Sequence, residues 1–519
     1  MVFSEALKAE VSKTKTLTEN GAVAYESSGK LLLDFNFAVT ALRNAESDAE
    51  ITQMFSKAFY EDPAVAVQFL FWLRDCRGGL GERRIFRACF KWLVDVRPEV
   101  VKATLGLVPE YGRFDDLWPL LDTDARADVI EFVGNTLAQD GSLIAQGKPS
   151  SIILKWMPSI NTSSKKTRHY AEVIRKALGM TSSEYRKVLS AGRRYLDVVE
   201  RKMSSGEWSQ INYSTVPSKA NLIYKDAFMR HDEERRTKYL DSLQKGETKI
   251  NAGVLQPHEI VHDYIKNYSG YYWDYNKNNT NIDPTLEELW KALPDVTIDD
   301  CLVVRDGSGS MTGGYGTTVR PLDVATALAI YMSEHNSEAW KDKFITFSSR
   351  PKFVDLGNCE TLREKINVCM DEDECSNTNI EATMMLILNT AISNHMDQED
   401  MPKRILILSD MQFDMASNCG YWARNKFKSP SKALFEEIAE IFNAYGYDMP
   451  KIVFWNLSGN VNKTIPMQEN KLGVVLCSGF SVQLMQMVMS GETDPYKVLL
   501  DTINVPRYAP VKEALKGIL

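Results

Sequence analysis

Three side chains that could bind a metal ion lie close together in the turn 306–310, whose sequence is Asp-Gly-Ser-Gly-Ser. The turn follows an apolar run at 301–304 that is rich in β-branched residues and predicts a buried strand. One carboxylate and two hydroxyls suit a small divalent cation such as Mg²⁺, which prefers oxygen ligands and keeps several waters. An open α/β sheet also binds its ligands beyond the carboxyl ends of its strands. The sequence therefore predicts that Asp306, Ser308 and Ser310 hold a divalent cation.

Two other interpretations of this turn need no metal. A Gly/Ser-rich turn can simply end a strand, with its Asp capping a helix. Glycines after a strand also occur in nucleotide-binding loops, but Gly307, Gly309 and Gly313 lack the Gly-x-Gly-x-x-Gly spacing, and the chain has no full Walker A pattern. We reject the nucleotide interpretation and keep the plain turn as the alternative to a metal site.

The pattern Asp-x-Ser-x-Ser at 306–310 resembles the metal-ion-dependent adhesion site of von Willebrand factor A domains. By that resemblance, Thr378 in the polar turn 376–379 supplies a more distant hydroxyl, and Asp410, after the apolar strand 404–409, supplies a second carboxylate. The resemblance implies Mg²⁺ or another divalent cation with one position open to an acidic side chain of a protein partner. The implied ligands are Asp306, Ser308, Ser310, Thr378 and Asp410.

The elements expected around this site alternate between strands and helices after residue 300. Such alternation predicts a doubly wound, Rossmann-like α/β domain with Asp306 at its first crossover. We expect strands at 301–305, 343–348, 352–356, 404–409, 451–457 and 473–477, and helices at 323–336, 380–393, 431–444, 480–489 and 495–503.

The first half of the chain has apolar residues at helical spacing instead. Asp62-Pro63 is a helix-start signal, and Thr181 with Glu184 forms the capping-box pattern. Consecutive helices with short breaks predict an all-helical, repeat-like (HEAT-like) domain, although no repeat of fixed length is visible. We expect an N-terminal arm at 1–35, the helical domain at 36–295, and the von Willebrand factor A-like domain at 296–519.

The block 74–84, Arg-Asp-Cys-Arg-Gly-Gly-Leu-Gly-Glu-Arg-Arg, resembles a segment of the Ro ribonucleoprotein autoantigen and its bacterial relatives. Those proteins join a ring of helical repeats, the TROVE module, to a von Willebrand A domain. The resemblance implies binding of small or misfolded structured RNA through a basic ring. Blocks at 108–117, 155–159, 217–221 and 408–414 also resemble an uncharacterised family of plants, viruses and bacteria with the same two-part layout.

Basic residues concentrate in the segment 148–250, which carries 21 Lys and Arg against 11 Asp and Glu, whereas the whole chain has a net charge of −8. Basic pairs beginning at 186, 193 and 201 recur every seven or eight residues, which keeps them near one helix face. Such a face is often merely solvated, but its charge also suits a polyanion. The Gly-rich break 77–84 could likewise contact phosphate or form a helix–helix corner. The predicted RNA-binding residues are Lys165, Lys166, Arg168, Arg186, Lys187, Arg193, Arg194, Arg201 and Lys202.

The segment 258–262 matches the HExxH pattern of zinc peptidases, with Pro257 as a helix-start signal. The pattern has only three fixed positions, and the candidate third ligands, Glu287 and Glu288, lie in a segment without clear periodicity. We therefore interpret it as a helix start in a connecting region and expect no bound zinc.

Hydrophobic residues make up 44% of the chain and charged residues 25%, as in ordinary globular proteins. The eight cysteines, at 76, 89, 301, 359, 369, 375, 419 and 477, form no CxxC pair and are expected to be reduced thiols. The N-terminal residues form no apolar leader, and no apolar run reaches membrane-spanning length. We expect a cytoplasmic protein without a membrane partner.

These features predict a non-enzymatic RNA-binding or ribonucleoprotein scaffold with a metal-dependent docking site. Its expected partners are structured or misfolded small RNA and a protein that offers an acidic residue to the metal. One alternative is an intracellular protein-interaction module that binds no RNA. A metal-dependent hydrolase ranks third, because the chain has only six histidines and the serines of the turn lack a neighbouring His base.

Overall fold

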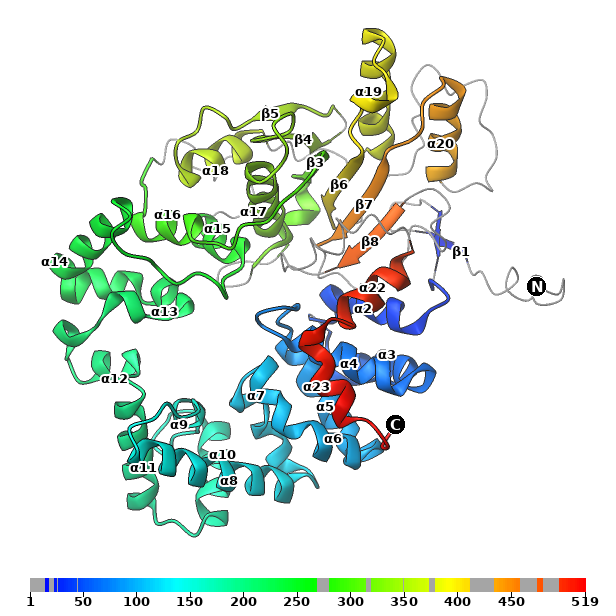
Figure 1. Cartoon of the computed structure of the whole chain (residues 1–519). Coiled ribbons are helices and arrows are strands. Elements are labelled where there is room, and N and C mark those ends of the chain that lie inside the picture. The colour runs from blue at the N-terminus through cyan, green and yellow to red at the C-terminus, as the bar shows by residue number, and fades with distance from the viewer. Residues whose placement is uncertain are drawn as a thin grey trace. The chain divides into compact units, whose positions relative to one another are not determined.

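The computed structural model (Figure 1) describes residues 15–17, 23–25, 27–43, 45–267, 280–313, 319–348, 350–372, 379–410, 434–457, 474–478 and 494–519. The chain divides into two compact units, which we call the sheet unit (Met1–Glu50 and Leu255–Thr502) and the helical unit (Ile51–Val254 and Ile503–Leu519). The domain limits predicted from the sequence separate an all-helical region from a region in which strands and helices alternate. The compact units instead place the helices after residue 254 with the sheet.

The sheet unit is built on six strands in the order β5-β4-β3-β6-β7-β8. All neighbouring pairs are parallel except β4–β5, so β5 is an antiparallel edge strand. In this doubly wound order the strand sequence reverses between β3 and β6, which creates the crevice where such sheets bind ligands. The strands are β3 (Cys301–Asp306), β4 (Lys343–Phe347), β5 (Phe353–Asp355), β6 (Arg404–Ser409), β7 (Lys451–Asn456) and β8 (Val474–Ser478).

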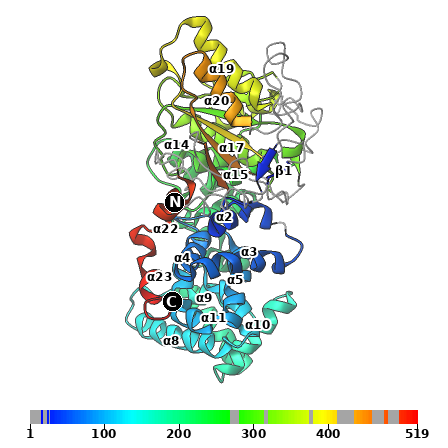
Figure 2. The ribbon, with the colours of Figure 1, turned by 90° about the vertical axis from the view of Figure 1, so that its right-hand side faces the viewer.

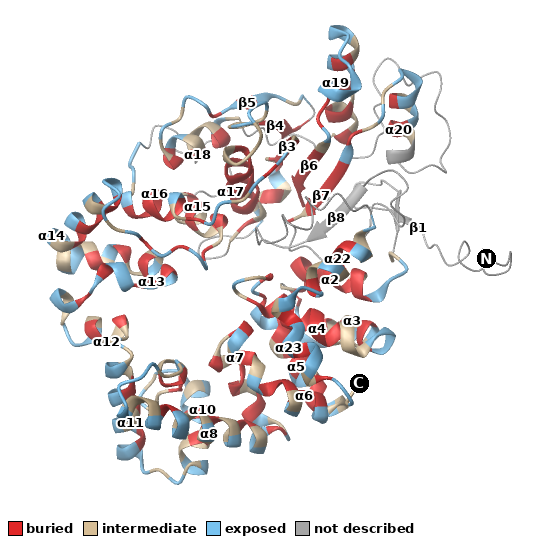
Figure 3. Ribbon diagram, viewed as in Figure 1, coloured by how far each residue is buried: buried red, intermediate tan, exposed pale blue. Residues whose placement is uncertain are grey.

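Helices cover both faces of this sheet. Leu302 and Val304 of β3 belong to a buried cluster with Met384 and Leu388 of α19 and Ile438 of α20. The next residue, Arg305, points to the other face and hydrogen-bonds Thr326 of α17. Figure 3 shows buried residues along β6 and β7 and on α17. The helices of the unit are α2 (Leu31–Leu42), α15 (Pro257–Ile265), α16 (Pro284–Lys291), α17 (Pro321–Glu334), α18 (Leu362–Asp371), α19 (Ile380–Asn394), α20 (Leu434–Ala444) and α22 (Pro495–Ile503).

The predicted α/β architecture is confirmed, with one helix that the sequence analysis missed. Each predicted strand is present, and the predicted helix at 480–489 lies outside the described residues. The missed helix is α18, which begins with a capping box between Thr361 and Glu364. Its buried residues recur at helical spacing at Leu362, Ile366 and Cys369, so both signals were present in the sequence.

The connecting helices α15 and α16 are fixed to α18 by one carboxylate. Glu287 accepts hydrogen bonds from the backbone N–H groups of Leu362 (2.8 Å) and Arg363 (3.2 Å) at the start of α18. The hydroxyl of Tyr264 on α15 donates to the same carboxylate at 2.7 Å. Because a carboxylate satisfies helix N–H groups and the N-terminal end of the dipole, this contact explains why the segment packs with the sheet.

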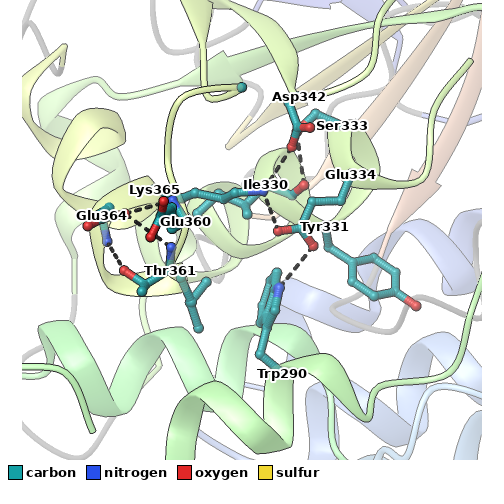
Figure 4. Close-up of polar contacts among 12 residues, drawn as sticks. Trp290, Ile330, Tyr331, Ser333, Glu334, Asp342, Glu360, Thr361, Glu364 and Lys365 are labelled. Atoms are coloured by element: carbon teal, nitrogen blue, oxygen red, sulfur yellow. Dashed lines mark hydrogen bonds and ion pairs between the residues drawn. The ribbon is translucent and has the colours of Figure 1, made fainter. Parts of the chain in front are cut away.

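A second polar cluster joins α16, α17 and α18 (Figure 4). Lys365 Nζ contacts Glu334 at 2.9 Å and Asp342 at 2.8 Å, and the Trp290 indole donates to Glu334 at 2.9 Å. Only 12% of the Lys365 side chain is exposed. Burial opposes its charge, but the two carboxylates outweigh it and raise the pKa of Lys365. Two partly buried acids thus share one ammonium as their counter-charge.

The helical unit consists of consecutive helices, as predicted. The Asp62 side chain caps α4 by accepting from Val65 N, and the Thr181–Glu184 capping box starts α11. Helices α8, α10 and α11 lie side by side at one end of this unit (Figures 1 and 2). Its helices are α3 (Asp48–Glu61), α4 (Pro63–Arg74), α5 (Arg83–Val96), α6 (Pro98–Thr104), α7 (Val108–Tyr111), α8 (Arg126–Ala145), α9 (Ile153–Trp156), α10 (Lys165–Ala177), α11 (Ser182–Tyr195), α12 (Val199–Ser204), α13 (Ser218–Ile223), α14 (Lys225–Gln244) and α23 (Ala509–Ala514).

The arm at 1–35 contributes a short antiparallel pair, β1 (Lys15–Leu17) with β2 (Val23–Tyr25), before α2 begins at Leu31. In the described part of the chain, every helix is too short or too polar to cross a bilayer.

Replacing Lys365 by Met should destabilise the sheet unit by about 3 kcal/mol, because it leaves Glu334 and Asp342 without their shared counter-charge. Since the folded-state pKa of Lys365 is raised, its contribution is present through neutral pH and is lost only as the pH rises above 10.5. Urea unfolding of wild type and variant at neutral pH and at pH above 11 measures both effects.

The control is Lys341→Met. Lys341 is half exposed and reaches the exposed Glu338 only at 4.0 Å, so its loss should change the unfolding free energy by less than about 0.5 kcal/mol. Equal effects of the two substitutions would contradict the buried ion-pair account.

Candidate functional site

The predicted metal ligands Asp306 and Asp410 lie at the switch point of the sheet. Strands β3 and β6 pair in register, with Arg305 opposite Leu408. Asp306 at the end of β3 is completely buried, and Asp410 just after β6 is 4% exposed. Asp306 Oδ1 accepts from Ser308 N at 2.9 Å, and Oδ2 accepts from the Ser409 hydroxyl at 2.6 Å. The two carboxylates thus leave adjacent parallel strands at the same end.

The hydroxyls of the turn complete the oxygen cluster. Ser308 Oγ and Ser310 Oγ lie 3.0 Å apart, and Ser308 is buried. Burial, and then the negative charge of Asp410, raise the pKa of Asp306 above its usual range. Two buried carboxylates that repel each other, with hydroxyl oxygens beside them, fit a divalent cation. Thr378, the fifth predicted ligand, lies outside the described residues.

The HExxH segment forms helix α15, but its side chains have other partners. The His262 ring contacts Asp323 at 2.6 Å, and Glu259 accepts from the Gln256 backbone N–H at the start of the helix. Throughout the described ranges, no three His, Cys, Asp or Glu side chains gather closely enough to bind a metal by themselves. The metal site expected at the switch point would therefore combine its two carboxylates with hydroxyl oxygens.

The helical unit contains a cavity of about 1590 Å³, which we call the basic cavity. It lies between the corner 74–84, the segment 109–113, and helices α9, α11, α12 and α13. Glu200 is the single acidic residue among those that line it. Ten basic residues line it: Arg74, Arg77, Arg83, Arg113, Lys155, Arg186, Arg193, Arg194, Arg201 and Lys219.

Four of the nine predicted RNA-binding residues line the basic cavity, namely Arg186, Arg193, Arg194 and Arg201. Arg186 and Arg194 are exposed and form no ion pair with a described carboxylate. Arg201 pairs with Glu207 at 2.8 Å. The cavity lining does not include the remaining five, which are Lys165, Lys166, Arg168, Lys187 and Lys202. The first four of these five are exposed on helices α10 and α11.

Arg193 and Lys202 are used within the fold. The Arg193 guanidinium donates to the carbonyls of Leu154 and Met157 and to the Ser159 hydroxyl, at 2.8 to 3.2 Å. Gly192 allows this approach, because a Cβ there would lie 2.2 Å from Leu154 Cδ1. The Arg193 side chain therefore holds α9 against α11.

Lys202 is 7% exposed, and its ammonium contacts Asp197 at 2.7 Å and the Gln210 carbonyl at 2.8 Å. An ammonium buried between two such acceptors supports the chain around α12. It is poorly placed to reach a phosphate.

The Gly-rich corner 74–84 uses its backbone amides for its own structure. Gly79 N and Gly81 N donate to the Asp75 carbonyl, and Glu82 N donates to the Leu73 carbonyl at 2.8 Å. A Cβ at Gly79 would lie 1.8 Å from the Trp72 carbonyl oxygen, so the turn requires glycine there. The backbone of this segment therefore forms a helix–helix corner, and the amides of Gly79, Gly81 and Glu82 are not available to bind phosphate. Three of its arginines, Arg74, Arg77 and Arg83, line the basic cavity.

Six basic residues of the cavity were missed by the list of predicted RNA-binding residues: Arg74, Arg77, Arg83, Arg113, Lys155 and Lys219. Burial, then the charges of Arg113 and Arg87, lower the pKa of Arg83, while Asp115 and Asp116 oppose the shift. The Arg113 guanidinium is held by Asp115 and lies 4.0 Å from the centre of the Trp156 ring. Most of these residues lie in the blocks 74–84, 108–117, 155–159 and 217–221, so the blocks were the available signal.

Lys219 lies on α13, and its side chain keeps solvent access. The surrounding protein is nonetheless close enough that burial lowers its pKa to about 8. A lysine in this environment favours a bound anion, which would stabilise its charged form.

Taken together, the fold and these sites define a protein with a doubly wound α/β unit, acidic at its switch point, and a helical unit with a basic cavity. The chain belongs to the family described as Domain of unknown function (DUF2828), which matches residues 18–112 and 128–297. A second description, Domain of unknown function (DUF7788), matches residues 300–502.

Two known proteins are similar over most of the chain. Uncharacterized protein L728 of Acanthamoeba polyphaga mimivirus is 29% identical over 539 aligned positions, spanning 94% of this chain and 87% of that protein. The crystal structure of Deinococcus radiodurans RO (RSR) protein covers 92% of this chain and 99% of that chain, with 12% identity and a TM-score of 0.29. The resemblance of block 74–84 to Ro proteins stays a prediction.

The lowered pKa of Lys219 predicts unusual reactivity toward amine reagents. At pH 8 roughly half of Lys219 is neutral and nucleophilic, against well under 1% of a lysine with a pKa near 10.4. Limited acetylation followed by peptide mass spectrometry should therefore modify Lys219 before the exposed Lys165 and Lys166, with a rate midpoint near pH 8. Slower modification of Lys219 than of those two lysines at pH 8 would contradict the assignment.

Proposed function

We propose that this protein is a non-enzymatic RNA-binding scaffold. The basic cavity of the helical unit binds RNA, and the switch point of the sheet unit binds Mg²⁺, or a similar cation, as a docking site for an acidic group. The observation that carries the RNA proposal is the composition of the lining of one cavity, which includes ten Arg and Lys residues and one acidic residue, Glu200.

Some arginines of the basic cavity have no carboxylate paired with them, which supports an anionic ligand. Arg77, Arg83, Arg186 and Arg194 form no ion pair with any carboxylate of the described residues. Holding these guanidinium groups together costs electrostatic energy, which a bound polyanion would recover. Eight of the ten cations are arginines, whose planar fork matches phosphate oxygens.

The size and surface of the cavity favour a polymer over a small anion. Pockets for small molecules have about 300 to 1,000 Å³, and this cavity exceeds that range. The Arg113–Trp156 stack offers a flat surface of the type that unpaired bases use. The sequence resemblance of block 74–84 to Ro proteins points the same way. An acidic protein segment is the runner-up ligand.

The metal proposal is supported by the donor set. Asp306 and Asp410 supply two buried carboxylates, and Ser308 and Ser310 supply hydroxyls beside them. Mg²⁺ bound there would offset the carboxylate repulsion and leave coordination positions for water or a partner's carboxylate. This arrangement supports docking, and we assign no residue a catalytic role.

Removal of cavity charges should weaken RNA binding in a salt-dependent manner. In the double variant Arg83→Ala/Arg194→Ala, the slope of log K against log salt for a single-stranded RNA should fall by about 1.4, since each phosphate contact contributes about 0.7. Fluorescence anisotropy titrations over a salt series measure the slope. Arg193 is left intact because its guanidinium holds α9 against α11.

The matched control is Lys165→Ala/Lys166→Ala, which removes two exposed charges outside the cavity. It should change the slope by less than half as much. A larger effect of the control pair would place RNA on α10 instead, and a wild-type protein that binds no RNA at low salt would favour the protein-interaction alternative.

Mg²⁺ should raise the Tm of the wild-type protein, because a ligand of the folded state adds about 2.7 kcal/mol at one hundred times its Kd. Asp410→Asn should abolish that rise. In EDTA the same variant should be at least as stable as the wild type, since it removes the repulsion with Asp306. Thermal unfolding with and without Mg²⁺ tests this, with the exposed Asp397→Asn as control. No shift of the wild type with Mg²⁺, Mn²⁺ or Ca²⁺ would sink the metal proposal.

A further inference from the structure

Helix α13 presents one face to the basic cavity. Lys219, Ala220 and Ile223 of α13 and Tyr224, the residue directly after it, all line the cavity, and positions i and i+4 are neighbours on a helix surface. Lys219 and Ile223 are therefore neighbours, with a cation directly beside an aliphatic side chain. The proposed electrostatic binding of phosphate uses Lys219 but gives Ile223 no role.

Three apolar residues that line the cavity are unusually exposed. Ile223 is 66% exposed, Ile152 is 48% and Val254 is 37%. Three of the twelve large exposed hydrophobic residues in the described chain thus line a single cavity. A cavity that served phosphate alone would gain nothing from exposed aliphatic surface, because phosphates are fully polar. The ligand must also carry apolar surface.

The α13 face is held rigidly from behind. Asn221 donates to the Val216 carbonyl at 3.1 Å and accepts from Arg236 Nη1 at 3.0 Å. Arg236 is completely buried, and three aromatic rings lie 5.1 to 5.4 Å from its guanidinium carbon, those of Tyr213, Phe228 and Tyr239. An exposed face on so firmly anchored a helix is pre-organised for a ligand.

We infer that α13 forms a nucleotide subsite within the basic cavity, in which Lys219 binds a phosphate and Ile223 with Tyr224 receives the base of an unpaired nucleotide in an RNA strand. This inference rests on the proposed RNA binding, and it adds that the cavity selects single-stranded RNA over a duplex. Side chains at i and i+4 have Cβ atoms about 5 to 6 Å apart, a spacing suited to a phosphate and its own base across one sugar. A duplex hides its base faces, so this subsite selects single strands.

An acidic peptide with apolar side chains is the competing occupant. The flat stack of Arg113 on Trp156 in the same cavity favours nucleobases, because planar guanidinium and indole surfaces match the faces of bases. The count of basic residues favours closely spaced phosphates, one to each nucleotide, over the occasional carboxylates of a peptide.

The test compares two single-stranded probes of equal length, a fluorescent oligoadenylate and an abasic oligomer with the same sugar–phosphate backbone. Ile223→Ser in the full-length protein should weaken oligoadenylate binding about fivefold to tenfold, since it removes most of one aliphatic contact. It should leave the abasic oligomer unaffected. Ile223→Phe should tighten oligoadenylate binding only. Lys219→Gln should weaken both probes and lower the salt slope by about 0.7.

Ile282→Ser is the matched control, because Ile282 is 44% exposed in the sheet unit, and it should change neither probe. Unchanged oligoadenylate affinity of Ile223→Ser, or an equal loss for the abasic oligomer, overturns the base subsite and leaves RNA binding by the cavity intact. If the wild type binds neither probe, the RNA proposal fails and the subsite fails with it. An acidic Glu/Leu peptide that displaces oligoadenylate, and that Ile223→Ser weakens equally, assigns the α13 face to a protein partner.

Discussion

The buried ion pair between Arg74 and Asp116 is the contact on which the geometry of the basic cavity depends. The two side chains are 4% and 0% exposed, and Arg74 reaches Asp116 Oδ2 at 2.7 Å. Asp116 also accepts from Arg87 Nε at 2.8 Å and from the Arg113 backbone N–H at 2.9 Å. A carboxylate this deeply buried is tolerated only because several donors surround it. The same contacts join the end of α4, helix α5 and the segment 113–116, and so fix the positions from which Arg77, Arg83 and Arg113 enter the cavity.

The C-terminal segment forms hydrogen bonds with Asp75, the residue that follows Arg74 in the corner 74–84. Asp75 accepts from Arg507 Nη2 at 2.9 Å and from the Tyr508 hydroxyl at 2.9 Å, and Tyr111 donates to the Arg507 carbonyl at 2.7 Å. These contacts raise the pKa of Arg507, chiefly through its hydrogen bonds to Asp75. The sequence separates Asp75 from Arg507 by most of the chain. No local pattern could reveal that residues 503–519 complete the helical unit, and the predicted domain limits accordingly followed element type alone.

The sequence could predict features that depend on neighbouring residues, such as where a strand ends or which residues share a helix. A β-branched run ending in Asp306 and an apolar run ending before Asp410 were sufficient to place two carboxylates at the ends of two strands, because sheet pairing then brings those ends together. Periodicity also placed Arg193 and Arg194 on the same helix, but it could not distinguish them. One guanidinium turns inward to the carbonyls of Leu154 and Met157, and the other faces the cavity. Which of two adjacent cations is structural depends on a neighbouring helix that sequence spacing does not specify.

The two sites share one physical property, which is charge that the fold leaves incompletely neutralised. In the sheet unit, Asp306 is buried close to Asp410, and its pKa is raised. In the helical unit, Arg83 lies among other arginines, and its pKa is lowered. Opposite pKa shifts at the two places mean that each environment disfavours the charged state of the group it holds. Natural folds retain such strain mainly where a ligand relieves it.

The contacts of Arg236 fix the orientation of α13 beside the basic cavity. A fully buried Arg236, enclosed by aromatic rings, is a costly way to hold a short helix, since an apolar residue would avoid the desolvation of a charge. Its guanidinium bonds Asn221 and thereby fixes the rotation of α13 about its axis. Apolar packing alone restrains such rotation weakly, because it is non-directional. Only a fixed rotation keeps Lys219 and Ile223 facing the cavity together. The buried arginine therefore restrains the orientation of the side chains by which α13 lines the basic cavity.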